Sequence, residues 1–202
     1  MTFAAVVLAG YLLGSCPWGY WLVRLFRHED VRLVGSGNIG ATNVWRAYGR
    51  TLGLPVIALD VLKSFVPALI GVLAVSHVCG IVAVAAAMLG HWRPLFLRFA
   101  KGGKMVASAG GVFFAVAPLV AVVASGIWCV FFLATRYVSV ASIAATLSLP
   151  ALAAALGYPP AVIAFSGFAA AGVLVLHRGN LRRLRAGTEN RARLRRTVRS
   201  SA

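Results

Sequence analysis

The 31 residues 105–135 carry no charge, and this stretch most constrains how the chain can fold. As one α-helix it would be about 46 Å long, whereas the hydrocarbon core of a bilayer is about 30 Å thick. A single spanning helix would therefore need strong tilt. We predict instead two short helices, joined by a turn at Ala124-Ser125-Gly126.

The overall composition is that of a membrane protein. Of the 202 residues, 60% are hydrophobic and 12% are charged, whereas a soluble domain carries about 25% charged residues. Lys and Arg number 20 against 4 acidic residues. These basic residues lie between and after apolar segments, where the positive-inside rule accounts for most of them, so we expect no nucleic-acid partner. We predict one integral-membrane domain over residues 1–202, in which 177–202 include a basic cytoplasmic tail.

Further apolar segments with the length of membrane spans lie near residues 3–23, 54–75, 81–97, 139–156 and 161–176. The basic loops 24–53 and 93–104 should both be cytoplasmic. If 105–135 crosses twice, the arginine-rich tail joins them, and if it crosses once, the tail lies outside. We therefore predict an all-α polytopic membrane protein, a seven-helix transmembrane bundle with some short helices. Its N-terminus would be outside and its C-terminus cytoplasmic, and a re-entrant pair at 105–135 is the alternative.

Residues 35–43, GSGNIGATN, form the most polar loop between the spans. Glycines let a loop turn several backbone N–H groups toward one point, which suits a phosphate. Basic residues flank the loop on both sides: Arg24, Arg27, Arg32, Arg46 and Arg50. The pattern predicts an anion-binding loop at the end of a membrane helix.

The predicted topology brings three more polar segments to the same membrane face. They are 101–104 (KGGK), 135–142 with Ser139 and Ser142, and 177–190. The first lacks Walker A spacing, although its glycines still allow close approach to a phosphate, with lysine as a point charge. His177 lies three residues before Asn180, so both can face one site along a helix, where a neutral imidazole can act as a base.

Asp60 and Lys63 lie inside the second predicted span at helical spacing. Ionisable residues inside a membrane suggest function, but we favour an ion pair on one helix face that positions a cytoplasmic loop. Cys16, Cys79 and Cys129 are far apart and show no metal-binding spacing. No carboxylate cluster suited to a hard metal occurs in the sequence, so we predict no metal site.

At these loops the chain resembles the acyl-phosphate:glycerol-3-phosphate acyltransferases of bacterial membranes, the PlsY family. The resemblance covers nearly the whole chain, at residues 11–20, 34–46, 60–67, 90–107, 135–139 and 177–189. The sequence departs from the family pattern in Ser64 and Met105, where glycine is usual, and in Ser108, where threonine is usual. Segment 99–102 is one residue longer than is usual in the family. The position of Lys104 is therefore the part of the match that departs most from the family pattern.

The resemblance implies transfer of a fatty acyl group from acyl phosphate to the 1-hydroxyl of glycerol 3-phosphate. The products would be 1-acyl-glycerol 3-phosphate (lysophosphatidic acid) and phosphate, in the first step of membrane phospholipid synthesis. Acyl phosphate is an activated mixed anhydride, so no covalent nucleophile and no cofactor are required. We expect a monomer in contact with membrane lipid, multi-pass in the bacterial cytoplasmic (inner) membrane, with its active site near the cytoplasmic face.

The resemblance also implies roles for residues. Arg46 and Lys104 would stabilise phosphate charge, Ser36 would help to cradle a phosphate, and His177 would orient or deprotonate the attacking hydroxyl. A phosphate of the substrate is the alternative base. The expected substrate-binding residues are Gly37, Asn38, Thr42, Gly102, Gly103, Ser142 and Asn180.

A membrane carrier for phosphorylated anions is the alternative function, motivated by the intramembrane residues Asp60 and Lys63. A carrier needs polar sites at mid-membrane that are reachable from both faces. Here the polar residues are concentrated on one face, while the turns on the opposite face, 76–80 and 157–160, contain few polar residues. We therefore favour the acyltransferase.

Overall fold

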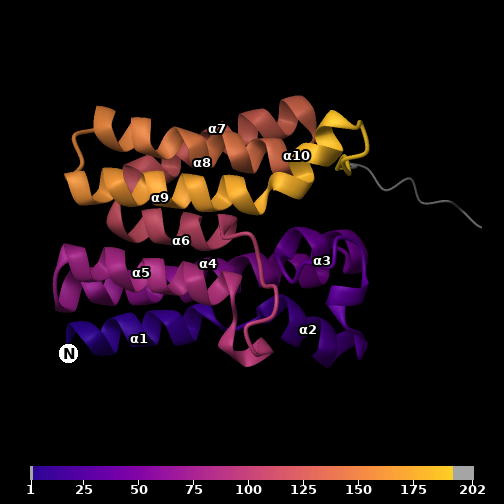
Figure 1. The fold of residues 1–202 in the computed structure, drawn as a ribbon, viewed down its shortest axis with the longest axis horizontal. Helices are drawn as coiled ribbons and strands as arrows, with labels where there is room; N and C mark the ends of the chain where they lie inside the picture. Colours follow the sequence, from indigo (N-terminus) through magenta and orange to yellow (C-terminus); the bar gives the residue numbers. More distant parts are fainter. Residues whose placement is uncertain (1, 193–202) are drawn as a thin grey trace, which may run out of the picture.

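The computed structural model describes residues 2–192, and within them the regular structure is entirely helical. Figure 1 shows long helices that run back and forth along one direction. The first predicted span is broken into α1 (Phe3–Gly14) and α2 (Trp18–Arg27). The break falls at Pro17, which has no backbone N–H to continue the hydrogen-bond ladder of α1.

The next helices lead into and out of the membrane. A 3-10 turn, η1 (Val31–Leu33), and α3 (Ala41–Tyr48) flank the glycine-rich loop. Two long helices follow, α4 (Arg50–Ala74) and α5 (His77–Trp92), and then a second 3-10 turn, η2 (Leu95–Leu97). The predicted second and third spans are therefore confirmed as helices, with ends shifted by a few residues.

The uncharged stretch forms α6 (Val106–Val116) and α7 (Pro118–Thr135). The predicted division into two helices is confirmed, but the predicted turn at Ala124-Ser125-Gly126 is wrong, because these residues lie inside α7. The chain breaks at Ala117, which leaves helical geometry immediately before Pro118. With 11 residues α6 is about 16 Å long, roughly half of a bilayer core.

The last helices are α8 (Val138–Ala155), α9 (Pro160–Leu176) and α10 (Arg178–Arg185). α9 and α10 meet at an angle of 54°. Among the described residues, five helical stretches are long and apolar enough to cross a membrane, or six if the bent pair α9–α10 is one span, and α6 is a shorter apolar helix. The seven predicted segments are thus all present as helices, although α6 is too short to cross by itself.

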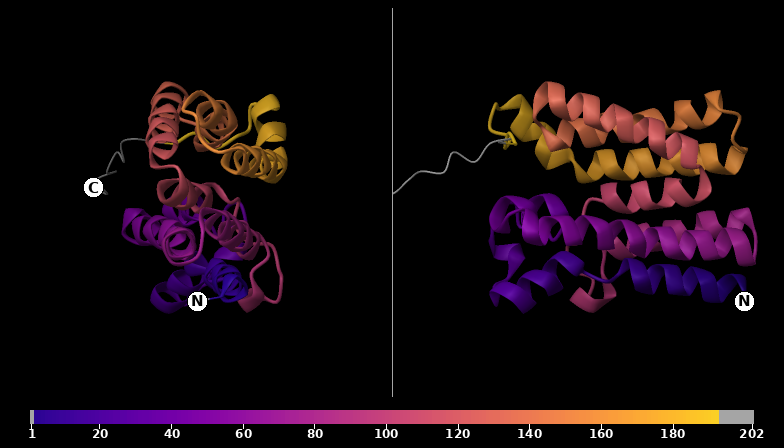
Figure 2. Two further views of the ribbon diagram at one scale, coloured as in Figure 1. Left: turned by 90° about the vertical axis from the view of Figure 1, so that its left-hand side faces the viewer. Right: turned by 180° about the vertical axis from the view of Figure 1, so that it is seen from behind.

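The helices form two groups with α6 between them (Figure 2). α1, α4 and α5 pack together on one side, and α7, α8 and α9 pack on the other. Close packing of α1 on α5 depends on small residues, because a Cβ at Gly10 or Gly14 would overlap the carbonyl oxygens of Ala83 and Ala87. The short helices α2, α3 and α10 all lie at the same end of the molecule, which gathers the polar loops there (Figure 1).

Candidate active site

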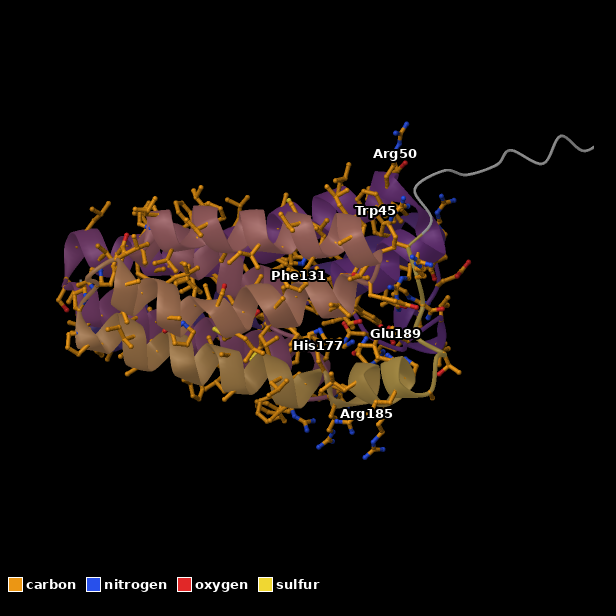
Figure 3. All side chains as sticks on the ribbon, turned by 90° about the horizontal axis from the view of Figure 1, so that it is seen from above. Trp45, Arg50, Phe131, His177, Arg185 and Glu189 are labelled. Atoms are coloured by element: carbon orange, nitrogen blue, oxygen red, sulfur yellow. The ribbon has the colours of Figure 1, made fainter. Side chains whose placement is uncertain are left out.

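Charged side chains gather at the end of the bundle formed by α2, α3 and α10 (Figure 3). Arg50 and Arg185 point outward there, whereas His177 and Glu189 point inward between the helices. The polar segments predicted to share one membrane face do lie at one end of the molecule. The rest of the bundle exposes large apolar side chains such as Leu73 and Val130, as a surface in contact with lipid requires.

The carboxamide of Asn43 holds the glycine-rich loop in shape. Its Oδ1 accepts a hydrogen bond from the backbone N–H of Ser36 at 3.0 Å, and its Nδ2 donates to the carbonyls of Val34 and Asn38, both at 2.9 Å. Gly35 and Gly37 adopt left-handed backbone angles, with φ of 62° and 65°. Such angles suit glycine, so the sequence GSG and the buried Asn43 together set the path of the loop.

Asn38 joins this loop to the lysine-glycine segment. Its Nδ2 donates to the carbonyl of Gly102 at 3.1 Å, and its Oδ1 accepts from the N–H of Gly40 at 2.7 Å. Both ends of the Asn38 side chain are thus engaged with backbone, which makes it a link between two loops. Ser36 and Thr42, by contrast, have exposed side chains.

A cavity of about 220 Å³ opens beside the loop. Arg46 lies on its wall and donates to the carbonyl of Asn190 at 3.2 Å. Arg46 is exposed as a residue, but partial burial of its guanidinium lowers its pKa from the usual value, and the negative charge of Glu189 opposes that change. The cavity is lined by Val34, Gly35, Ser36, Asn43, Arg46, Ala47 and Asn190.

Lys104, Asn180 and Glu189 form a chain of short hydrogen bonds. The ammonium of Lys104 donates to Oδ1 of Asn180 at 2.6 Å, and Nδ2 of Asn180 donates to Oε1 of Glu189, also at 2.6 Å. Burial lowers the pKa of Lys104 to about 8, and the charge of Arg183 adds to this effect. The lysine is therefore a partly desolvated cation held beside the last helix.

Glu189 lies at the centre of this end of the molecule, and it is not among the site residues predicted from the sequence. It accepts from Ser139 at 2.9 Å and from Nε of Arg183 at 2.7 Å, in addition to Asn180. Burial favours the neutral acid, but these three hydrogen bonds hold its pKa below the usual value. A signal was available, because Glu189 is the one acidic residue after Asp60 and lies in an arginine-rich segment.

His177 lies at the bend between α9 and α10 and is buried. Its Nδ1 is 2.8 Å from the carbonyl oxygen of Val173. A carbonyl only accepts, so Nδ1 carries the proton and Nε2 of the neutral ring has a free lone pair. The imidazole thus has the tautomer required of a hydrogen-bond acceptor or base.

Ser142 connects the polar end to an apolar cavity. The serine is buried in α8, and its Oγ accepts from Nε1 of Trp128 at 3.1 Å. Trp128 also lines a cavity of about 200 Å³ between α6, α7 and α8. The other lining residues are mainly small or apolar and include Gly110, Phe113, Ala124 and Leu149.

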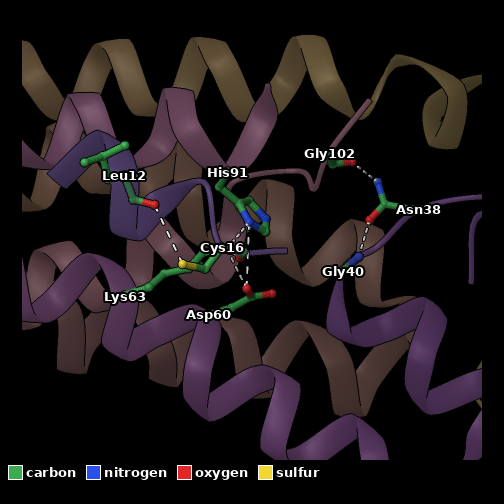
Figure 4. A network of polar contacts seen from close by, with 8 residues as sticks. All are labelled: Leu12, Cys16, Asn38, Gly40, Asp60, Lys63, His91 and Gly102. Atoms are coloured by element: carbon green, nitrogen blue, oxygen red, sulfur yellow. Dashed lines mark hydrogen bonds and ion pairs between the residues drawn. The ribbon is translucent and has the colours of Figure 1, made fainter. Parts of the chain in front are cut away.

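The predicted pair of Asp60 and Lys63 is present and buried, with Lys63 Nζ 2.8 Å from Oδ1 of Asp60. Figure 4 shows that His91 joins the pair and that Gly102 and Asn38 lie close by. Within residues 2–192 no group of three His, Cys, Asp or Glu side chains is placed to hold a metal ion.

The fold and the site are those of an integral membrane protein whose polar end is suited to bind anions and lies beside an apolar cavity. A family model described as glycerol-3-phosphate acyltransferase matches residues 4–187. Among curated relatives, the glycerol-3-phosphate acyltransferase of Aquifex aeolicus is 44% identical over 92% of this chain and 97% of its own length. That of Geotalea daltonii is 44% identical over 94% and 98%.

Two solved structures of PlsY, an integral membrane glycerol 3-phosphate acyltransferase, have the same fold. The glycerol 3-phosphate form has a TM-score of 0.90 at 43% identity and covers 95% of this chain and 96% of that one. The lysophosphatidic acid form has a TM-score of 0.86 at 42% identity, with 94% of each chain covered. The chain belongs to the glycerol-3-phosphate acyltransferase family, and the resemblance inferred from its motifs is confirmed.

Proposed function

We propose that this protein transfers a fatty acyl group from acyl phosphate to the 1-hydroxyl of glycerol 3-phosphate. The main support for this proposal is that the cations Arg46 and Lys104 both lie at the polar end of the molecule, beside an apolar cavity. Both substrates bear phosphate, and one of them also bears an acyl chain. The PlsY structures in the glycerol 3-phosphate and lysophosphatidic acid forms are of the same family, and they support glycerol 3-phosphate as the acceptor and lysophosphatidic acid as the product.

In this mechanism the hydroxyl oxygen attacks the carbonyl carbon of acyl phosphate, and the bond from that carbon to the phosphate oxygen breaks. The anhydride supplies the activation, so no covalent intermediate on the enzyme is needed. Lys104 and Arg46 stabilise the charge on the departing phosphate, because partly desolvated cations interact strongly with such charge. The exposed Ser36 hydroxyl hydrogen-bonds the same group.

Nε2 of His177 accepts the proton of the attacking hydroxyl or orients that hydroxyl. A phosphate oxygen of the substrate is the alternative acceptor. Asn180 and Ser142 bind substrate through their remaining hydrogen-bonding capacity, together with Thr42 and the backbone of Gly37, Gly102 and Gly103. Asn38 contributes by joining the two loops. The acyl chain occupies the apolar cavity behind Trp128.

The proposal includes the setting of the enzyme. The polar end faces the cytoplasm of a bacterial inner membrane, since the basic loops and the described part of the arginine-rich tail lie there. The N-terminus then lies outside, and the whole chain acts as one domain and as a monomer. The carrier hypothesis is less favoured, because Asp60 and Lys63 are paired with each other in the protein interior.

The test is phosphate release by purified protein in detergent or bilayer, with acyl phosphate and glycerol 3-phosphate. Release that requires both substrates is expected, and release without glycerol 3-phosphate, or none at all, contradicts the proposal. Arg46→Ala and Lys104→Ala should each lower kcat by about a hundredfold. Uptake of labelled glycerol 3-phosphate into sealed vesicles without acyl transfer would favour the carrier.

A further inference from the structure

Three buried ionisable side chains meet where α4 and α5 pass the break between α1 and α2 (Figure 4). Asp60, Lys63 and His91 are 2%, 4% and 3% exposed. Burying charge inside a membrane bundle is costly, so an arrangement of this kind usually serves a purpose beyond stability. The proposed mechanism uses none of the three.

The ammonium of Lys63 is held by one ion pair, to Asp60, and by two hydrogen bonds, to Cys16 and His91. Nζ lies 2.8 Å from Oδ1 of Asp60, 2.8 Å from Nδ1 of His91 and 2.9 Å from the carbonyl oxygen of Cys16. Because an ammonium only donates, Nδ1 of His91 is the acceptor and the ring proton lies on Nε2. The geometry therefore fixes the tautomer and orientation of His91.

On one side the cluster of Asp60, Lys63 and His91 contacts the backbone at the break between α1 and α2. The carbonyl of Cys16 is at the point where Pro17 interrupts the helical ladder, and a lysine donor satisfies it. α2 then begins against the glycine-rich loop. A Cβ at Gly19 would overlap the carbonyl oxygen of Ile39, so the backbones of α2 and the loop are in direct contact.

On the other side the cluster supports the lysine-glycine segment. Gly103 donates its N–H to the carbonyl of His91 at 2.9 Å, and Gly102 donates to the carbonyl of Trp92 at 2.9 Å. The ring of His91 lies directly against Gly103, where any Cβ would overlap Nε2. Lys104 is the next residue in the chain.

We propose that Asp60, Lys63 and His91 form a buried positioning unit for acyl transfer, which fixes Lys104 relative to the glycine-rich loop. This inference rests on the proposed role of Lys104. The unit contacts both walls of the site through backbone, at Cys16 and at Gly103, and the hydrogen bond from Asn38 to Gly102 closes the connection. Loss of the Lys63–His91 contact releases the ring that supports Gly103 and so displaces Lys104.

The test compares His91→Leu, which removes the acceptor for Lys63, with His91→Asn, whose Oδ1 can take the place of Nδ1. Rates are measured per folded enzyme, in the acyl-transfer assay with whichever acyl donor the wild-type protein accepts. For His91→Leu we expect kcat to fall about tenfold to a hundredfold, because small displacements of a catalytic group have effects of this size. KM for glycerol 3-phosphate should change by a smaller factor than kcat, since the displaced Lys104 acts mainly on the charge that develops on the departing phosphate.

His91→Asn should recover kcat to within about threefold of the wild type. The matched control is His77→Leu, at the opposite end of the same helix, where the histidine ring contacts the carbonyl of Val116. This control should change kcat less than about twofold. It separates the effect of losing a histidine hydrogen bond in α5 from the effect of losing the support of Gly103.

Equal kcat in His91→Leu and the wild type would overturn the proposal, as would a loss in His91→Leu that His91→Asn does not reduce. If His91→Leu fails to fold, Asp60→Asn takes its place, because it keeps the side-chain volume and weakens the hold on Lys63. A kcat that falls by a larger factor than KM rises then supports the unit, and a wild-type kcat overturns it. Failure of the acyl phosphate proposal is distinguished by the wild-type control, which would then be active with a different donor.

Discussion

The ammonium nitrogen of Lys104 lies 2.6 Å from Oδ1 of Asn180, although 76 residues separate the two in the chain. The contact joins the segment before α6 to α10, so it connects the two groups of helices at the polar end. Asn180 in turn is held by Glu189. The position and the charge of Lys104 therefore depend on both halves of the molecule.

The pH dependence of activity should report on Lys104. Burial lowers its pKa to about 8, and the ammonium, which is the phosphate-binding form, exists below that pKa and is lost as the pH rises through it. We expect kcat/KM to fall above about pH 8. In Lys104→Arg, whose guanidinium stays protonated, the fall should move to higher pH even if the maximal rate is lower. Equal midpoints in the two pH profiles would contradict the assignment.

Glu189 should be needed to assemble the site. Glu189→Gln removes the charge that Arg183 faces and replaces one acceptor oxygen by a donor, so we expect the free energy of unfolding to fall by about 1–3 kcal/mol. Acyl transfer should fall as well, because Asn180 and Lys104 lose their support. Thermal unfolding and kcat in detergent measure both effects. Glu29→Gln is the matched control, since Glu29 is exposed and contacts the hydroxyl of Tyr48. Equal effects of the two substitutions would refute the assembling role.

The positions of the helices could be predicted from the sequence, because apolar length is a strong signal for membrane spans. The turn is predicted from the sequence at residues 124–126, whereas the chain breaks at Ala117, immediately before Pro118. In a membrane the penalty for an unpaired carbonyl keeps Ser125 and Gly126 helical. The hydroxyl of Ser125 even donates back to the carbonyl of Ala121, at 2.7 Å. Proline, which lacks the N–H, was the more reliable sign.

The gathering of polar loops at one end could also be predicted, because it follows from the positions of the basic residues and from the number of membrane crossings between them. The role of each side chain within the site could not be predicted. Asn38 is predicted from the sequence to bind substrate, and in the structure its amide is engaged with the backbone of Gly40 and Gly102. Asn43, for which the sequence predicts no separate role, holds the loop through backbone contacts. Likewise His91 joins Lys63 across 28 residues, a contact that depends on how α5 packs on α4. Such long-range contacts have no local sequence pattern.

The donor groups of Asn43 should be as important as its size. Asn43→Asp keeps the acceptor for the N–H of Ser36 but places carboxylate oxygen against the carbonyls of Val34 and Asn38. Repulsion should open the loop, so we expect KM for glycerol 3-phosphate to rise and kcat/KM to fall by about tenfold or more. Steady-state kinetics measures this, and a variant with wild-type kcat/KM would show that the loop does not need these hydrogen bonds.

The apolar cavity should limit the acyl chain. Gly110 lies on its wall, and a Cβ at this position would meet no heavy atom within 4 Å. Gly110→Leu therefore starts from a Cβ that meets no clash, and its side chain takes up cavity space that a long acyl chain would occupy. We expect kcat/KM for palmitoyl phosphate to fall about tenfold more than for decanoyl phosphate, since each buried methylene contributes to binding. Gly126→Leu on α7 is the matched control, because a Cβ there also meets nothing within 4 Å and Gly126 is not among the residues that line the cavity. An equal loss with both donors would place the acyl chain elsewhere, on the lipid-facing surface of the bundle.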